Sequence, residues 1–356
     1  GRLAFLADRL VYSDPASVTH NTSLSRQIVM EAETRYRIGE SHLLYGGLHN
    51  TLAFGRHDNY GGWRHQNRGA VLAGYTWSPP SGKIQCALSL RQEILNLQWA
   101  PLTGFAGVTF APWRWLEIKA LGNRVYRVPT LNDLYWRPGG NPQLQPEHGF
   151  SAEGGLKLKT SWKAWRLSTE VTYFSRLIKN WIIWLPAGAF WTPQNLMQVW
   201  SRGTETFSCI EWHRKKFRVS LTVLSQYVLS TNQKSKLPGD ASVGRQLIYT
   251  PMYSGLAALS LQFSRLSFIY RHNYVGYRYI STDNAQFLPP YHLGSFSAEY
   301  HLKAGRHLWG AFFQLFNIWN VAYQVMSQRP MPGRHFLAGL SWHFQSNSSK
   351  TSIRKP

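Results

Sequence analysis

Residues 335–344 read HFLAGLSWHF, and this stretch decides the fold class. In an extended chain, successive side chains point to opposite faces. One face carries the larger apolar side chains, Phe336, Ala338, Leu340, Trp342 and Phe344. The other carries His335, Leu337, Gly339, Ser341 and His343. The first set suits contact with lipid and the second suits a wet interior, which is typical of a strand in a transmembrane β-barrel.

The same alternation recurs at 164–173 and at 293–303. In both stretches charged side chains gather on the more polar face, and they include both signs. A packed soluble core tolerates such charges only when they are paired, so we expect this face to line a hydrated lumen.

Connections between the alternating stretches are short and long in strict turn. We expect short turns at 38–41, 78–82, 111–114, 160–163, 213–216, 263–265 and 303–306. We expect long loops near 13–22, 57–67, 97–104, 127–147, 186–195, 230–250, 279–291 and 323–333. This regularity is expected when all short turns lie on one side of a membrane, and it predicts an all-β, transmembrane antiparallel β-barrel with about sixteen strands.

Composition agrees with this class. Aromatic residues make up 15% of the chain, and no apolar run approaches the roughly 18 residues that a spanning helix needs. Six tryptophans flank the predicted short turns, where an aromatic girdle would lie: Trp77, Trp113, Trp115, Trp162, Trp165 and Trp212. A soluble β-sandwich with tryptophans at its strand ends is the alternative.

The net charge of +22 does not come with a nucleic-acid motif, so we expect no nucleic-acid partner. We interpret most basic residues as solvent-exposed parts of turns and loop tips. Alternatively, they bind phosphate-rich lipid headgroups or an anionic ligand.

Cys86 and Cys209 fall on strands too far apart for a disulfide and are expected to be free. No catalytic or metal-binding motif is present, and we expect neither an enzyme nor a cofactor nor a metal site.

One loop carries a specific signal. Residues 124–147 read RVYRVPTLNDLYWRPGGNPQLQPE, with two runs of regularly spaced residues. The first run is Arg127, Pro129, Leu131, Asp133, Leu134 and Tyr135, and the second is Gly140, Asn141, Pro142, Leu144, Pro146 and Glu147. Both runs resemble the paired boxes of TonB-dependent outer-membrane receptors. Residues 171–184 and the hairpin 314–344 are similar to later strands of the same family.

The resemblance implies a barrel of about 22 strands and an amino-terminal plug domain. Residues 1–344 would then be a barrel portion, with about six strands and the plug absent, and 345–356 a basic polar tail. Since the chain opens within an apparent strand at 2–12, we expect a fragment or one piece of a split receptor.

The resemblance also implies TonB-dependent uptake of a scarce, bulky nutrient in the outer membrane of a Gram-negative cell. The expected partners are outer-membrane lipid, a TonB-type energy-transducing protein acting through the plug, and a surface lipoprotein or the remaining barrel segment. Loop aromatic residues and an arginine are the candidate ligand contacts: Tyr135, Trp136, Arg137, Tyr277, Tyr279 and Tyr291.

The sequence of residues 132–142, NDLYWRPGGNP, favours cobalamin or another corrinoid as the ligand, followed by a ferric siderophore. Haem ranks third, because haem receptors usually place a histidine between the boxes and 130–140 contains none. A passive sixteen-stranded porin is the main alternative function, and a barrel enzyme or an adhesin is the third.

Overall fold

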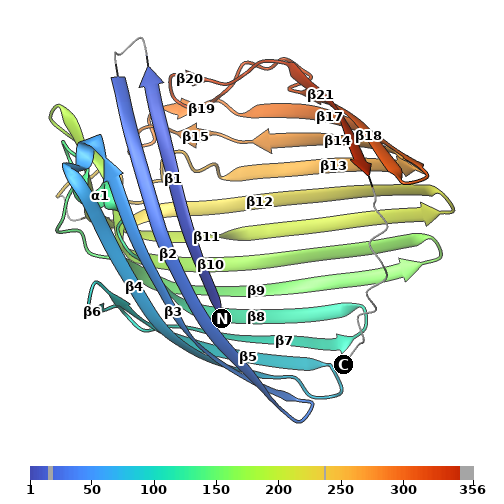
Figure 1. Cartoon of the computed structure of the whole chain (residues 1–356), viewed down its shortest axis with the longest axis horizontal. Coiled ribbons are helices and arrows are strands. Elements are labelled where there is room, and N and C mark those ends of the chain that lie inside the picture. The colour runs from blue at the N-terminus through green and yellow to red at the C-terminus, as the bar shows by residue number, and fades with distance from the viewer. Residues whose placement is uncertain (15–18, 236–237, 345–356) are drawn as a thin grey trace.

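The computed structural model describes residues 1–14, 19–235 and 238–344. They form one large, strongly curved antiparallel sheet in which each long strand pairs with the next one along the chain (Figure 1). The main sheet has 17 strands, and sixteen remain when the two-residue β6, which pairs only with β5, is left out. The predicted fold class and strand number are confirmed. The predicted tail at 345–356 lies outside the described residues.

The long strands fall into two halves of the meander. The first half is β1 (Arg2–Asp14), β2 (Thr19–Ile38), β3 (His42–His57), β4 (Gly62–Trp77), β5 (Ile84–Leu95), β7 (Thr103–Trp113), β8 (Leu116–Arg127) and β9 (Glu147–Trp162). The second half is β10 (Trp165–Ala187), β11 (Phe190–Arg214), β12 (Phe217–Ser235), β13 (Tyr253–Phe263), β14 (Leu266–Val275), β17 (Tyr291–Ala304), β18 (His307–Phe316) and β21 (His335–Phe344).

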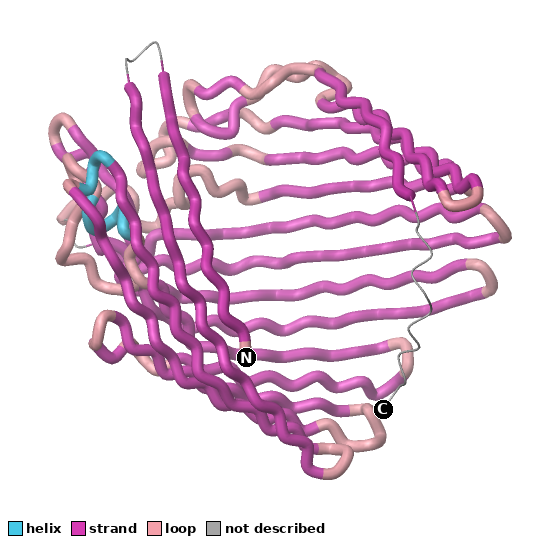
Figure 2. Tube along the Cα trace, viewed as in Figure 1, coloured by secondary structure: helices cyan, strands magenta, loops and turns pink. Residues whose placement is uncertain are grey.

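Short elements occupy the connections at the other end of the sheet from the tight turns (Figure 2). They are η1 (Asp58–Tyr60), β6 (Gln98–Trp99), α1 (Leu131–Tyr135), β15 (Arg278–Tyr279), β16 (Phe287–Leu288), β19 (Gln324–Met326) and β20 (Arg329–Pro330). None of the helices in the described part of the chain is long and apolar enough to cross a membrane.

The prediction of a long loop at 186–195 is wrong. Strands β10 and β11 continue through it, with Ala187 facing Phe190 across a tight turn. Within this stretch Pro193 pairs with Trp184 in register and is fully buried. The expected loop at 57–67 is also shorter than predicted, because β4 already begins at Gly62.

Side chains sort onto two faces. The polar face carries ion pairs between neighbouring strands, such as Arg68 Nε to Glu93 Oε1 at 2.8 Å and Lys157 Nζ to Glu170 Oε2 at 3.2 Å. The apolar face carries exposed aliphatic side chains, and the partners Leu48 and Val71 are 61% and 58% exposed. Alternation in the sequence therefore corresponds to two chemically different surfaces of one sheet.

Tryptophans mark the tight-turn end of the sheet. The Trp113 and Trp115 rings stack at 5.1 Å, and the partners Trp165 and Trp212 lie 6.4 Å apart. These positions agree with the turns expected from the sequence. Cys86 and Cys209 are free cysteines on β5 and β11.

The two ends of the meander remain unpaired with each other. Among the described residues β1 pairs only with β2, and β21 pairs only with β18. The sheet is therefore curved like a barrel wall but open between these two strands (Figure 1).

Candidate functional site

Helix α1 lies at the centre of the loop that carries the two boxes. Thr130 caps the helix: its Oγ1 accepts the Asp133 amide at 3.1 Å, while Asp133 Oδ2 accepts the Thr130 amide at 2.9 Å. Asp133 is 7% exposed, and its Oδ1 accepts the indole Nε1–H of Trp184 at 2.9 Å. One carboxylate thus closes the capping box and fastens the loop to β10.

A second fastening holds the two ends of the loop together. Arg127, the last residue of β8, donates from Nε to Glu147 Oε2 at 2.8 Å and also bonds Oε1. Glu147 begins β9, is 5% exposed, and accepts the Ile182 amide at 2.9 Å. This fork-shaped pair fixes where the loop leaves and rejoins the sheet.

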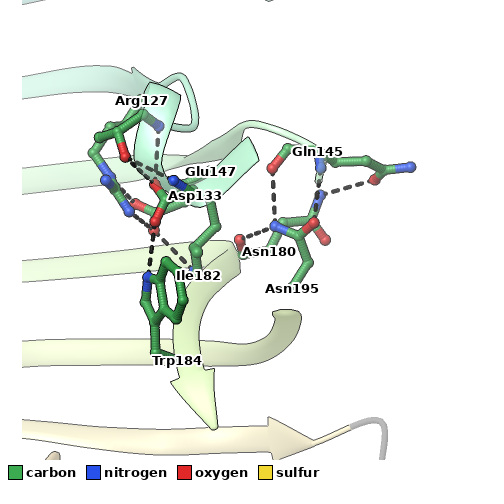
Figure 3. A network of polar contacts seen from close by, with 9 residues as sticks. Arg127, Asp133, Gln145, Glu147, Asn180, Ile182, Trp184 and Asn195 are labelled. Carbon is green, nitrogen blue, oxygen red and sulfur yellow. Dashed lines mark hydrogen bonds and ion pairs between the residues drawn. The ribbon is translucent and has the colours of Figure 1, made fainter. Parts of the chain in front are cut away.

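The third fastening is a set of amides (Figure 3). Asn195 accepts the Gln145 amide at 2.7 Å, and its Nδ2 donates to the carbonyls of Gln145 and Asn180 at 2.8 Å. Asn195 sits on β11, so the loop is tied to the β10–β11 hairpin as well as to β9. The loop therefore has backbone partners over most of its length and is an ordered surface.

Helix α1 packs on the polar face of β3. A Cβ added at Gly55 would lie 2.8 Å from Leu131 Cδ1, so glycine makes room for the helix. The Tyr60 hydroxyl of η1 bonds Asn132 Oδ1. Burial raises the pKa of the Tyr60 phenol, and the nearby Asp133 carboxylate adds to the rise. Since α1 lies over the polar face, the loop leans toward the inside of the curved sheet.

Three of the residues predicted to contact the ligand lie at the end of this helix. Tyr135 lies under the Arg64 guanidinium, 4.6 Å from the ring centre, and Trp136 lies 4.6 Å from the His57 ring. Arg137 is exposed and exchanges backbone and amide hydrogen bonds with Asn59 at 2.9 Å.

A cleft of 370 Å³ opens between α1 and the polar face of β1, β2 and β3. Its lining combines acidic, aromatic and amide groups, including Asp8, His57, Tyr60, Asn132 and Trp136. Such a mixture of flat rings and directed polar groups is suited to a large ligand with both apolar and hydrogen-bonding surfaces.

The tandem glycines allow the loop to pass close to other backbone. Gly139 has φ +116°, and a Cβ there would clash with the Trp191 carbonyl oxygen. A Cβ at Gly140 would lie 2.6 Å from the Trp136 amide nitrogen, although its φ is not positive. The first glycine is required by conformation and contact, the second by contact alone.

The other three predicted contacts belong to a second cluster, at the loop ends of β14 and β17. Tyr277 packs edge-on against Phe287 at 5.1 Å, and the Tyr279 carbonyl accepts the Tyr249 amide at 2.8 Å. Tyr291 lies between the Arg278 guanidinium, at 4.6 Å, and the Tyr323 ring, at 4.7 Å. Within the described residues, no hydrogen bond or ring contact joins this cluster to the residues around α1.

Arg278 is a residue that sequence reasoning missed. It is 4% exposed and donates to the Gln324 carbonyl at 2.9 Å and to the Pro289 carbonyl at 2.7 Å. Burial lowers the pKa of its guanidinium. It connects the loop after β14 with the loop after β18. Three more residues were missed: His57 contacts Trp136, Trp184 bonds Asp133, and Asn195 bonds Gln145 further along the loop.

The architecture is that of an outer-membrane barrel wall with structured loops at one end. The sequence family described as TonB dependent receptor-like, beta-barrel, matches residues 6–318. The chain therefore belongs to the TonB-dependent receptor β-barrel family, whose members are transporters of the outer membrane.

Two curated relatives match over parts of the chain. The vitamin B12 transporter BtuB of Vibrio vulnificus is 31% identical over 116 residues, which are 32% of this chain and 18% of that protein. The vitamin B12 transporter BtuB of Photobacterium profundum is 30% identical over 95 residues, 25% of this chain and 15% of that protein. The matches thus span less than a fifth of either relative.

Solved structures share the fold over nearly the whole chain. The FrpB iron transporter from Neisseria meningitidis superposes with a TM-score of 0.71 at 13% identity, covering 96% of this chain and 59% of that one. The copper transporter OprC gives 0.71 at 13% identity, with 94% and 60% covered. The ferric enterobactin receptor from Pseudomonas aeruginosa gives 0.67 at 15%, with 93% and 56% covered. At these identities the likeness concerns the fold alone.

Proposed function

We propose that this chain forms the wall and part of the outer mouth of a receptor that imports a scarce, bulky nutrient across the outer membrane. The observation that carries the proposal is the loop over 127–147, which three sets of contacts hold against the polar face. A preorganised binding surface loses less entropy when a ligand binds, and this favours a receptor over a passive pore.

The polar face is then the lumen and the apolar face meets lipid. Energy would reach the ligand through a plug domain and a TonB-type protein, and a surface lipoprotein or further barrel strands are the other proposed partners. No bond chemistry is asked of this chain.

We rank a corrinoid first, a ferric siderophore second and haem third. The partial match to two vitamin B12 transporters supports the first choice. The cleft beside Trp136 supports a large ligand of mixed polarity. Binding is tested by titrating cyanocobalamin, a ferric siderophore and haemin against the intact receptor and its Trp136→Ala variant.

We expect the corrinoid to bind most tightly and the variant to lose about tenfold or more in affinity, as for one good contact. Leu97→Ala is the control, since Leu97 is 90% exposed and is not among the residues lining the cleft. Absence of corrinoid binding would contradict the choice of ligand while leaving the receptor class in place.

A sixteen-stranded porin would need β1 to pair with β21, and the described residues contain no such pairing. Open edges leave backbone groups unsatisfied in lipid, so we expect the chain by itself not to form a stable barrel. A closed sixteen-stranded barrel with heat-modifiable migration would favour the porin.

A further inference from the structure

The apolar face carries an unusual concentration of positive charge at the loop end of its first strands. Arg9 on β1, Arg26 on β2 and Arg56 on β3 all lie on this face and are all exposed. We call these three residues the arginine cluster.

Strand register places the cluster in two adjacent rows. Arg9, Leu24, Arg56 and Trp63 form one row across β1 to β4, and Ala7, Arg26, Phe54 and His65 form the next. Neighbouring strands are about 4.8 Å apart and diagonal neighbours about 7–8 Å, so Arg26 lies within reach of both other arginines. Three guanidinium groups can thus converge on one small anion.

Within the described part of the chain, no acidic side chain pairs with this cluster. Arg26 lies over the Trp63 ring at 5.1 Å, and within the described residues none of the three arginines forms an ion pair. Asp8 points to the opposite face by alternation, and Asp58 accepts the Thr22 amide at 2.9 Å. Like charges this close repel, so an anion bound between the three arginines would stabilise them.

The height of the cluster above the tight turns indicates where a binding anion would come from. Arg56 lies fourteen residues beyond His42, the tight-turn end of β3. At about 3.3 Å per residue and a tilt near 40°, this is roughly 35 Å of height, above the apolar band of about 25 Å. Trp63 in the same row is 42% exposed and suits the membrane interface.

From these observations we propose that the arginine cluster binds the phosphate group of an outer-leaflet lipid. The proposal rests on the proposed outer-membrane location but not on the imported nutrient. Arginine suits this role because its planar guanidinium binds phosphate oxygens in pairs, and the hydrocarbon chains of the lipid would then lie along the apolar face below.

The test uses the intact receptor in detergent micelles with lipid A carrying two phosphates, and with the same lipid after dephosphorylation. Native mass spectrometry measures the fraction of protein that retains each lipid. At about 1 kcal/mol per arginine, three arginines should favour the phosphorylated lipid by about a hundredfold. The preference should fall as salt is added, because exposed charges are screened.

The variant Arg9→Gln/Arg26→Gln/Arg56→Gln should lose most of this preference. A matched control, Arg114→Gln/Lys215→Gln/Lys216→Gln, removes the same charge from exposed tight-turn residues and should keep it. The variant with lysine at all three cluster positions should keep most of it, which guards against an effect of lost folding.

Equal binding of both lipids by the wild type, or an unchanged preference in the glutamine variant, would overturn the proposal. Nutrient binding is measured in parallel on the wild type alone, because Arg56 also lines the cleft beside α1. Absence of corrinoid binding with retained lipid preference would count against the choice of nutrient and not against the cluster, while failure to reach the outer membrane would count against the proposed function itself.

Discussion

Replacing Asp133 by alanine should release the loop over 127–147 from its contacts without unfolding the sheet. The Asp133 carboxylate accepts hydrogen bonds from the amide and hydroxyl of Thr130 and from the Trp184 indole, at 2.9, 2.8 and 2.9 Å. Loss of the hydrogen bonds that the Asp133 carboxylate accepts from Thr130 costs about 1 kcal/mol, and the indole left without a partner about 1–3 kcal/mol. We therefore expect the loop to lose about 2–4 kcal/mol of local stability.

Hydrogen exchange measures this loss directly. The amides of Leu134, Trp136 and Asn141 bond carbonyls within the loop, so they report its opening. A loss of about 2–4 kcal/mol should speed their exchange by roughly 30- to 1,000-fold, while amides in the middle of β9 and β10 stay protected.

Two variants control the interpretation. Asp133→Asn keeps one carbonyl oxygen for either Trp184 or Thr130 and should lie between wild type and alanine. Asp283→Ala removes another loop carboxylate whose partners, Ser281 and Ala285, are local, and should leave the three reporter amides unchanged. Wild-type exchange at Leu134, Trp136 and Asn141 in Asp133→Ala would refute the view that this carboxylate fastens the loop.

Three further predictions concern the wall and the loops. Leu340 is 87% exposed on the apolar face, so Leu340→Arg should cost about 2–4 kcal/mol of folding free energy in lipid vesicles, whereas Ser341→Arg on the polar face should be tolerated; equal losses would show that the faces are misassigned. Gly139→Val should lower corrinoid affinity at least about tenfold in a binding titration, because its Cβ would strike the Trp191 carbonyl, and unchanged affinity would contradict this reasoning. Arg278→Ala should make the loops after β14 and β18 more sensitive to limited proteolysis, and an unchanged cleavage pattern would mean that Arg278 does not connect them.

The sequence alone was sufficient to predict the strands of the barrel wall and the face on which their side chains lie. Alternation gives the face of each strand because the side-chain period is two, and tight turns are marked by residues that end the alternation. It was insufficient at 186–195, where a long loop was expected and the two strands continue. In the structure Pro193 is a buried partner of Trp184, next to the register shifts of β10 near Trp181.

The site was only partly predictable. The paired boxes located the loop, but the role of Asp133 depends on Trp184, 51 residues further along the chain. The helix α1 itself was missed, although Thr130 and Asp133 have the spacing of a capping box. Arg278 gave no local signal, because its partners are backbone carbonyls of two different loops.

We propose that this chain belongs to an energised corrinoid receptor. The most direct measurement is uptake of labelled cyanocobalamin by cells that carry the complete receptor, with and without the TonB-type energy-transducing protein, together with binding of cyanocobalamin to the cell surface. We predict that uptake requires the energy-transducing protein and that surface binding survives without it. Uptake that is equal in both strains, accompanied by leakage of unrelated small solutes, would contradict the claim and identify a passive pore.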